Sequence, residues 1–263
     1  MFRKIGIASL LLALTVIVSN CSASHYSSDI DSIYRSVSGD CPSEISKPRE
    51  RVIWFCDDVT ADSVNKLLGE LDQTDILVID SIGGKTTEAI RLAEAIHKLK
   101  ITVLVNKICL SACAQHIALS ANEVYFQKNS IFGMHDSQTA TNVIVGGSID
   151  DVSIREENIE RAFYQKMGID EQTLFSPLNN LKASCIINRK EYISTGEMLL
   201  KSKYDYYMPS KTELTSFAPH TTFHSYPNLE DVARSTRSMK IRKVLSINFG
   251  VRNTGELTEL PDC

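Results

Sequence analysis

Short apolar runs alternate with amphipathic stretches in the first half of this chain. Residues 52–56, 76–79 and 101–105 are continuous apolar runs of strand length. The stretches between them repeat apolar residues every three or four positions, at Val64, Leu67, Leu68 and Leu71 and again at Ala89, Leu92, Ala93 and Ile96. Strand, helix, strand, helix and strand in this order predict an α/β fold with a parallel sheet built from right-handed crossovers. Apolar strands without alternation indicate a sheet covered on both faces.

The pattern continues downstream with shorter elements. We expect Thr60 to cap the first helix, a short helix at 112–121, and strand-like segments at 123–126 and 131–134. A longer helix should then run to Met167, opened by Ser148 with Asp151 three residues on and stopped by Gly168. The remaining expectations are a helix opened by residues 193–197 and a strand at 204–208.

The pattern of the N-terminal residues is typical of a targeting segment. A basic start is followed by an apolar run at 5–18, shorter than the ~20 residues of a spanning helix, and then by small polar residues. This layout predicts a secretory signal peptide at 1–24 and export to the periplasm or cell envelope. Residues 18–21 resemble a bacterial lipobox, which would make Cys21 a lipidated membrane anchor. Ordinary cleavage after Ala23 is the alternative.

These patterns divide the chain into four parts. After the signal peptide comes a polar N-terminal arm at 25–50, then one main domain at 51–216, and finally a C-terminal extension at 217–263 in which the pattern weakens. The 263 residues, 43% of them hydrophobic, suffice for one sizeable core. The net charge of -4, with both signs interspersed, argues against a nucleic-acid partner.

Cysteine use fits an oxidising compartment. There are seven cysteines, and without Cys21 an even number remains for pairing. Cys41 with Cys56 is the favoured disulfide, because it would pin the arm to the first strand; buried free thiols are the alternative. No metal site is expected, because Cys109 and Cys113 lack a second cysteine or histidine pair at metal-like spacing. No cofactor is expected either.

Two loops between a strand and a helix carry candidate chemistry. In Asp80-Ser81-Ile82-Gly83-Gly84, the glycines let backbone N–H groups approach a ligand closely, although such a pair is also common in plain turns. The second loop, residues 109–114, presents Ser111 on a sharp turn, with the N–H of the next residue on the same side. The simpler interpretation of this serine is a helix N-cap.

His135 completes the pattern. It ends a strand-like segment, whereas the other five histidines read as structural or surface residues; His116, on the predicted helix after Ser111, should point away from that serine.

Together, the order and spacing of Gly84, Ser111 and His135 resemble the proteolytic subunit of Clp proteases, within the crotonase superfamily. The chain is most similar to exported Clp-like proteins with a Cys-x-Ser-Ala-Cys motif, over about residues 51–208. The resemblance implies a spiral of ββα units around the parallel sheet. It also implies a serine peptidase or other acyl hydrolase in which Ser111 attacks a carbonyl and His135 takes the proton. Gly84 and Ala112 would supply the oxyanion-hole N–H groups, and Gly83 and Ile82 would contact the substrate, a peptide or protein.

The sequence departs from the family at the residue that orients the histidine. Lys190 stands where the family has an aspartate. Glu191 is the first candidate for this role and Asn188 the second; a Ser–His dyad or an inactive site are the other interpretations.

Other functional classes remain open from sequence alone. The fold could carry a catalytically inactive binding or scaffold protein of the cell envelope, or a crotonase-type acyl-CoA enzyme, against which export argues. The resemblance also implies a homo-oligomer assembled through the helix at 149–167, although that helix could equally pack on its own core.

Overall fold

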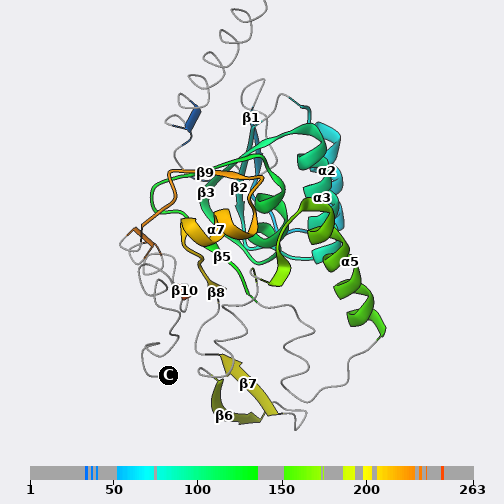
Figure 1. Ribbon diagram of the computed structural model, residues 1–263, viewed down its shortest axis with the longest axis vertical. Helices are drawn as coiled ribbons and strands as arrows, with labels where there is room; N and C mark the ends of the chain where they lie inside the picture. Colours follow the sequence, from blue (N-terminus) through cyan, green and yellow to red (C-terminus); the bar gives the residue numbers. More distant parts are fainter. Residues whose placement is uncertain are drawn as a thin grey trace, which may run out of the picture. The chain divides into compact units, whose positions relative to one another are not determined.

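The structure, a computed structural model (Figure 1), describes part of the 263 residues. The described residues are 33–34, 37, 40, 52–73, 76–135, 151–172, 174, 186–192, 198–202, 206–228, 231–232, 235 and 244–245, and the side chains of 151–153, 186–192, 198–202 and 244–245 are not included. The expected signal peptide with Cys21, and Cys41 in the expected arm, lie outside them. Contacts divide the chain into a short unit, Met1–Asp40, and a main unit, Cys41–Cys263. The short unit contributes one hydrogen-bonded turn, in which Val37 N–H donates to the Ile33 carbonyl at 2.8 Å.

A parallel sheet forms the centre of the main unit. Its strand order is β1-β2-β3-β4-β9, and β5 pairs with β3 as well. The strands are β1 (Val52–Phe55), β2 (Ile76–Ser81), β3 (Thr102–Leu110), β4 (Glu123–Phe126), β5 (Ile131–Gly133) and β9 (Thr222–His224). Every pairing in this sheet is parallel. The predicted α/β class is therefore confirmed, and the three apolar runs are its first three strands.

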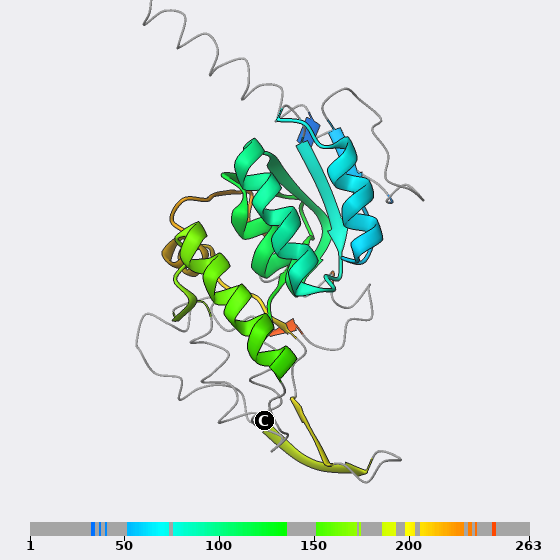
Figure 2. The same cartoon turned by 90° about the vertical axis from the view of Figure 1, so that its right-hand side faces the viewer.

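Helices line up along one side of the sheet. In Figure 2, α2 (Ala61–Glu70), α3 (Thr86–Leu99) and α5 (Asp151–Met167) lie in a row. The predicted apolar positions of α2 and α3 join a core cluster with Phe55, Leu77 and Val103 of the strands. Neighbouring strand residues such as Trp54 and Val78 are also buried, so both faces of the sheet are covered.

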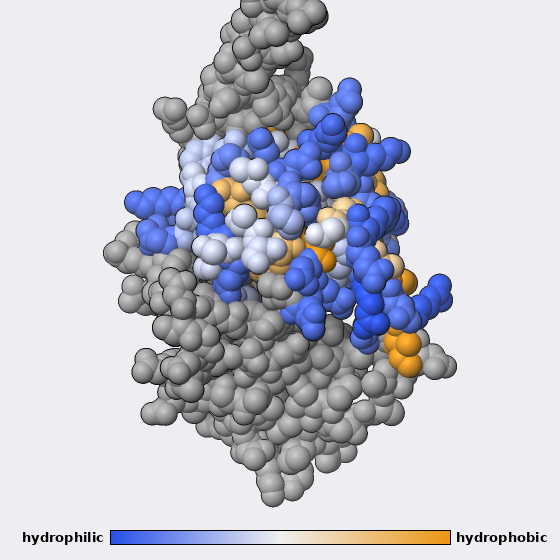
Figure 3. All heavy atoms as spheres, in the orientation of Figure 1, coloured by the Kyte–Doolittle hydropathy of each residue, from blue (hydrophilic) through white to orange (hydrophobic). Residues whose placement is uncertain are grey.

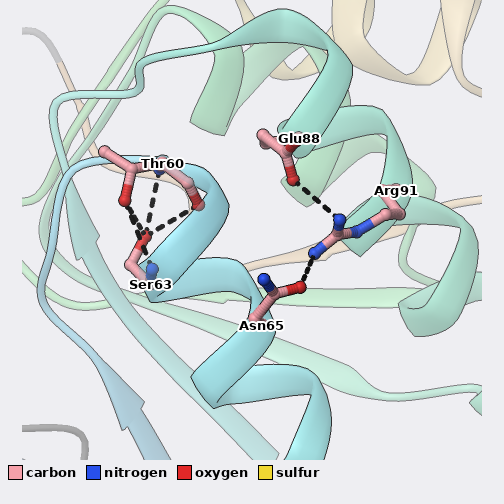
Figure 4. Close-up of polar contacts among 5 residues, drawn as sticks. All are labelled: Thr60, Ser63, Asn65, Glu88 and Arg91. Atoms are coloured by element: carbon pink, nitrogen blue, oxygen red, sulfur yellow. Dashed lines mark hydrogen bonds and ion pairs between the residues drawn. The ribbon is translucent and has the colours of Figure 1, made fainter.

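Polar contacts fix the start of α2 and its packing on α3 (Figure 4). Thr60 is the N-cap as predicted, and its hydroxyl accepts the Ser63 N–H at 3.2 Å while the Ser63 hydroxyl accepts the Thr60 N–H at 3.0 Å. On α3, Arg91 donates to Asn65 of α2 and forms an ion pair with Glu88 at 3.2 Å. The face shown in Figure 3 is mostly hydrophilic over the described residues, with small apolar areas between. No helix in the described ranges has the length and apolar character needed to cross a membrane.

The helix after Ser111 differs from the expected regular helix. It is a π-helix, η1 (Cys113–Ile117), followed by a 3₁₀ turn, η2 (Ala118–Ser120). The Ala118 N–H bonds the Cys113 carbonyl five residues back. The ring Nδ1 of His116 lies 3.3 Å from the Ala112 carbonyl, which an α-helix would offer to the backbone N–H of residue 116. Sequence periodicity contains no signal for such a local side-chain bond.

The expected helix opened by residues 193–197 is wrong. The flanking residues form an antiparallel hairpin of β6 (Ile186–Tyr192) and β7 (Met198–Ser202), while 193–197 lie outside the described residues. The isoleucines and the tyrosine of residues 186–192 favour a strand. Ser194 and Thr195, which suggested a helix cap, are equally suited to a turn.

The sheet continues past residue 216, where the C-terminal extension was expected to begin. β9 adds an edge strand to β4, and it is preceded by α7 (Lys211–Phe217), a helix that the sequence analysis missed. Its signal was a capping box, in which Ser210 and Glu213 bond one another's backbone N–H groups. The expected strand at 204–208 is present as β8 (Tyr206–Tyr207), which pairs with β10 (Val244–Leu245).

An irregularity in β3 lets this strand change partners. Residues 103–105 pair with β4, whereas 108–110 pair with β5. The register with β2 shifts between Ile79 and Ser81. Asp80 fills the break: its carboxylate accepts the Ile108 N–H at 3.2 Å and the Asn106 amide at 3.3 Å. Asp80 thus satisfies a backbone group that the ladder leaves unpaired.

We expect Asp80→Ala to destabilise the fold, because it leaves the Ile108 N–H without this acceptor. A fully buried donor left unsatisfied costs about 1–3 kcal/mol, and this donor is part-buried, so the loss should lie near the lower end of that range. The free energy of unfolding in urea measures the loss. Glu70→Ala, at the exposed end of α2, is the matched control and should change the free energy of unfolding by less than about 0.5 kcal/mol. Equal stability of the two variants would contradict the role assigned to Asp80.

Candidate functional site

Three neighbouring parallel strands end at the same edge of the sheet. β3 lies between β2 and β5, with Cys109 opposite Ser81 and Leu110 opposite Gly133. The residues that follow each strand therefore emerge side by side. This edge, outside the carboxyl ends of parallel strands, is where α/β proteins commonly bind ligands. It brings together the glycine turn, Ser111 and His135.

Ser111 is held in an unusual backbone conformation. Its φ is +54°, in the left-handed region that side-chain-bearing residues seldom adopt. Its N–H donates to the Gly133 carbonyl at 2.8 Å, and its carbonyl accepts the Gln115 N–H at 2.9 Å. The hydroxyl Oγ lies 2.5 Å from Nε2 of His135. Nucleophile and base candidates, far apart in sequence, are thus within hydrogen-bonding distance, as general-base activation of a serine requires.

Backbone pairing also fixes the position of His135. The preceding residue, Met134, exchanges two backbone hydrogen bonds with Tyr207, at 2.7 and 2.6 Å. Gly133 lies where a Cβ would be 2.7 Å from Leu110 Cδ2 and 3.0 Å from Tyr206 Cβ. A larger residue at this position would push against Leu110 and Tyr206, so the glycine lets β5 pack tightly beside them.

The environment of His135 favours its neutral form. Burial lowers the pKa of His135 below its ordinary value of 6.5; the charge of Glu160 works against this shift and that of His116 adds to it. A neutral imidazole at neutral pH is the form that can accept a proton from a serine.

The glycine turn after β2 is oriented by its neighbours. The Ser81 hydroxyl donates to the Asp57 carbonyl at 2.7 Å and accepts the Gly83 N–H at 3.2 Å. The Gly83 carbonyl accepts the Val59 N–H at 2.8 Å. In a planar trans peptide the next N–H points opposite to the carbonyl. The Gly84 N–H is therefore directed away from Val59.

Gly83 packs directly against the Ser111 turn. A Cβ at Gly83 would lie 2.8 Å from Ser111 Cβ and 2.9 Å from the Ala112 nitrogen, and its φ of +92° also favours glycine. A side chain at Gly84 would collide with the Val59 carbonyl. This packing brings the two turns, and with them two backbone amides, close to one another.

The same peptide geometry applies at Ala112. The Ser111 carbonyl faces the helix, where it accepts the Gln115 N–H, so the Ala112 N–H points out of the helix start. Within the described part of the chain, neither the Gly84 N–H nor the Ala112 N–H has a hydrogen-bond acceptor. Two amides beside a serine hydroxyl can stabilise an oxyanion.

The expected contact of Ile82 with a substrate stays a prediction. Ile82 lies directly before Gly83, and 52% of its surface is exposed although it is large and apolar. An exposed isoleucine in a turn between two well-packed elements is available to an apolar ligand group.

A disulfide brackets the serine. Cys109 at the end of β3 and Cys113 at the start of η1 are bonded, with their Cα atoms 5.2 Å apart. Cys56 is disulfide-bonded as well. Its expected partner, Cys41, lies outside the described residues, so that pairing stays a prediction. The alternative of free thiols is wrong for Cys56, Cys109 and Cys113.

A buried polar network lies beneath the serine turn and was missed by sequence reasoning. His116 Nε2 is 2.8 Å from Glu160 Oε1 of α5, and the Tyr164 hydroxyl donates to the same oxygen at 3.0 Å. His116 is 1% exposed, and it bonds Ala112 and Glu160, not Ser111. The sequence treated His116 as an isolated histidine, because Glu160 is 44 positions away.

The network holds Glu160 as a carboxylate. Burial by itself would raise the pKa of Glu160, but the hydrogen bond and charge of His116, with the Tyr164 hydroxyl, lower it below its ordinary value of 4.5. Burial beside this carboxylate raises the pKa of Tyr164 well above 10. Among the described residues, no group of three or more His, Cys, Asp or Glu is arranged to hold a metal ion.

The candidate orienters of His135 lie in β6. The backbone of Glu191 pairs with Leu199 of β7, but the side chains of this strand, including those of Glu191 and Asn188, lie outside the described part. The role of Glu191 stays a prediction.

Comparisons with known proteins add a distant structural likeness. The catalytic domain of the ClpP protease from Plasmodium falciparum matches with a TM-score of 0.32 and 15% sequence identity, covering 44% of this chain and 64% of that chain. The match spans less than two thirds of that domain. No protein-family model matches the chain, and no curated protein matches it.

We expect Glu160→Ala to cost about 1–3 kcal/mol of unfolding free energy at neutral pH, because it leaves the buried His116 ring and Tyr164 hydroxyl without the oxygen that both contact. Since the pKa of Glu160 is lowered on folding, its contribution is present above pH 4.5 and is lost as the pH falls through the folded value. Urea unfolding of both proteins at several pH values measures this.

Glu157→Ala is the matched control on the same helix. Glu157 is more exposed and forms an i,i+4 ion pair with Arg161 at 2.9 Å, so its loss should cost under about 0.5 kcal/mol. A Glu160→Ala cost no larger than that of this control would show that the buried network contributes nothing.

Proposed function

We propose that this protein is an exported serine hydrolase, a peptidase in its principal activity. The observation that carries the proposal is the 2.5 Å approach of Ser111 Oγ to His135 Nε2, beside the outward-facing N–H groups of Gly84 and Ala112. Nucleophile, base and oxyanion donors around one point are the parts that acyl transfer needs.

The reaction follows from the positions of these groups. The neutral His135 takes the proton of Ser111 as Oγ attacks the carbonyl carbon of the substrate. The carbonyl oxygen becomes an oxyanion, which the Gly84 and Ala112 amides stabilise. His135 then gives its proton to the leaving group, and an acyl-enzyme remains at Ser111. Water activated by His135 releases the acid and restores the serine.

A peptide substrate is supported by the turn beside the site. Ile82 is exposed next to the Gly83–Gly84 backbone. An apolar substrate side chain can pack on Ile82 while the substrate carbonyl reaches the amides. Crotonase-type acyl-CoA chemistry does not require a serine–histidine pair, so this arrangement favours the hydrolase.

Export and membrane attachment belong to the proposal through the sequence of residues 1–24. An apolar run between a basic start and small residues is the layout of a signal peptide. Lipidation at Cys21 would attach the protein to the membrane of the cell envelope. Assembly into a homo-oligomer through α5 also stays a prediction; Ile154 and Ile159 of this helix are exposed at 46% and 36%.

A fluorophosphonate probe should label the folded protein at Ser111. We expect Ser111→Ala to abolish labelling. His135→Ala should slow it by roughly 10³-fold or more, because the serine loses its base. Labelling rates and the modified peptide, identified by mass spectrometry, measure this. His97→Ala, which removes an exposed histidine on α3, should label at the wild-type rate.

Two outcomes would contradict the hydrolase. Equal labelling of Ser111→Ala would place the reactive group elsewhere. Failure of the folded wild-type protein to react with small or peptide-linked phosphonates would favour a non-catalytic binding protein.

The pH dependence should report the buried base. Because burial lowers the pKa of His135, the neutral base persists to lower pH than in a free histidine. The labelling rate should fall on the acid side with a midpoint below 6.5. A midpoint above 6.5, or the same acid limb in His135→Ala, would rule out His135 as the titrating group.

A further inference from the structure

The disulfide around Ser111 spans a position with an unusual backbone conformation. Cys109 is the penultimate residue of β3 and Cys113 the first of η1, so the bond closes a ring across the turn that carries Ser111. Ser111 has a positive φ of +54°. A side-chain-bearing residue in this region loses roughly 1–2 kcal/mol relative to its preferred conformations, and it stays there only where its surroundings enforce it.

Other contacts hold only part of this turn. The Ser111 N–H bonds Gly133, and Gly83 packs on Ser111 and Ala112 from one side. Neither contact joins the end of β3 covalently to the start of η1. The disulfide does so, and it spans Leu110, Ser111 and Ala112, which include the candidate nucleophile and one candidate oxyanion donor.

We propose that the Cys109–Cys113 disulfide is a positioning element of the active site, and that its formation switches on the hydrolase after export. This inference rests on the proposed function. In the thiol form the turn is free to relax toward a negative φ at Ser111, which moves Oγ away from His135 and turns the Ala112 N–H. A reducing cytoplasm keeps the cysteines as thiols, and an oxidising compartment closes the ring.

The activating step is a thiol–disulfide exchange. The two thiols of Cys109 and Cys113 give up two electrons and two protons to a disulfide oxidant of the exporting compartment, which leaves as two thiols. The new S–S bond replaces two S–H bonds. Both cysteines are 0% exposed in the folded protein, so a reductant opens the finished bond only slowly. The device therefore acts once, on folding, and not as a reversible sensor.

The test compares two variants that each remove a disulfide. Cys109→Ala/Cys113→Ala opens the ring around Ser111, and Cys56→Ala removes the disulfide bond of Cys56, the residue that follows β1. Fluorophosphonate labelling rates are measured across pH on the oxidised, exported protein, with circular dichroism and urea unfolding on the same samples. We expect the double variant to fold and to label about 10²-fold more slowly at the pH plateau, as for a reactant misplaced by about 1 Å.

The results expected for a positioning disulfide differ from those of a purely structural one. The double variant should keep the acid midpoint set by His135 while its plateau falls, and Cys56→Ala should lose stability yet label within about threefold of wild type. A folded double variant at the wild-type plateau would overturn the inference, and so would an equal fall in Cys56→Ala. A wild-type protein that does not label at all contradicts the proposed function instead.

If the double variant does not fold, reduction of the folded protein decides the matter. Cys56→Ala is kept in a small phosphine reductant for long enough to open the buried bond, and peptide mapping after alkylation shows that Cys109 and Cys113 are the thiols gained. The labelling rate should then fall by about 10²-fold and return on reoxidation with a disulfide oxidant. An unchanged rate with both thiols free would overturn the inference.

Discussion

The parallel pairing of β3 with β2 on one side and β5 on the other is the constraint on which the candidate site depends. It sets Leu110 opposite Gly133 and Cys109 opposite Ser81, so the three strands end at the same level of the sheet. A shift of one residue in either pairing would move a strand end by about 3.3 Å and turn its side chains to the other face. Ser111 and His135 would then be beyond hydrogen-bonding distance.

The backbone groups around this edge are satisfied in a way that leaves particular amides available. The Gly83 carbonyl accepts the Val59 N–H, and the Ser111 carbonyl accepts the Gln115 N–H. The Ser111 N–H donates to the Gly133 carbonyl. Since each peptide is planar, fixing one carbonyl fixes the direction of the following N–H. The Gly84 and Ala112 amides are thereby oriented before any ligand binds, which is what makes such donors effective in stabilising charge.

Local patterns in the sequence predict the elements that are built from local signals. The apolar runs of β1, β2 and β3, the helices between them and the Thr60 cap follow from periodicity and capping rules. Ser111 and His135 could be selected because a resemblance in order and spacing joined residues that are individually ordinary. The capping box at Ser210 and Glu213 was also readable, and it was missed.

Features that depend on contacts between distant segments could not be predicted from such local patterns. β9 is a three-residue strand whose partner is a hundred positions earlier in the chain, and so short a strand has almost no signal of its own. The π-helix is accompanied by a contact between the His116 ring and its own helix backbone, which periodicity does not indicate. The hairpin of β6 and β7 replaced a predicted helix because cap residues and turn residues are the same types.

The buried pair of His116 and Glu160 influences the pKa of His135 but does not determine the direction of its shift. Burying a charge is costly unless it is paired, and Tyr164 adds a further hydrogen bond to the pair. The two partners act in opposite directions on the pKa of His135, because Glu160 raises it and His116 lowers it. The two influences therefore offset one another in part. Burial, the largest influence, therefore determines the direction of the shift, and the base remains neutral although a carboxylate lies in the network beneath the turn.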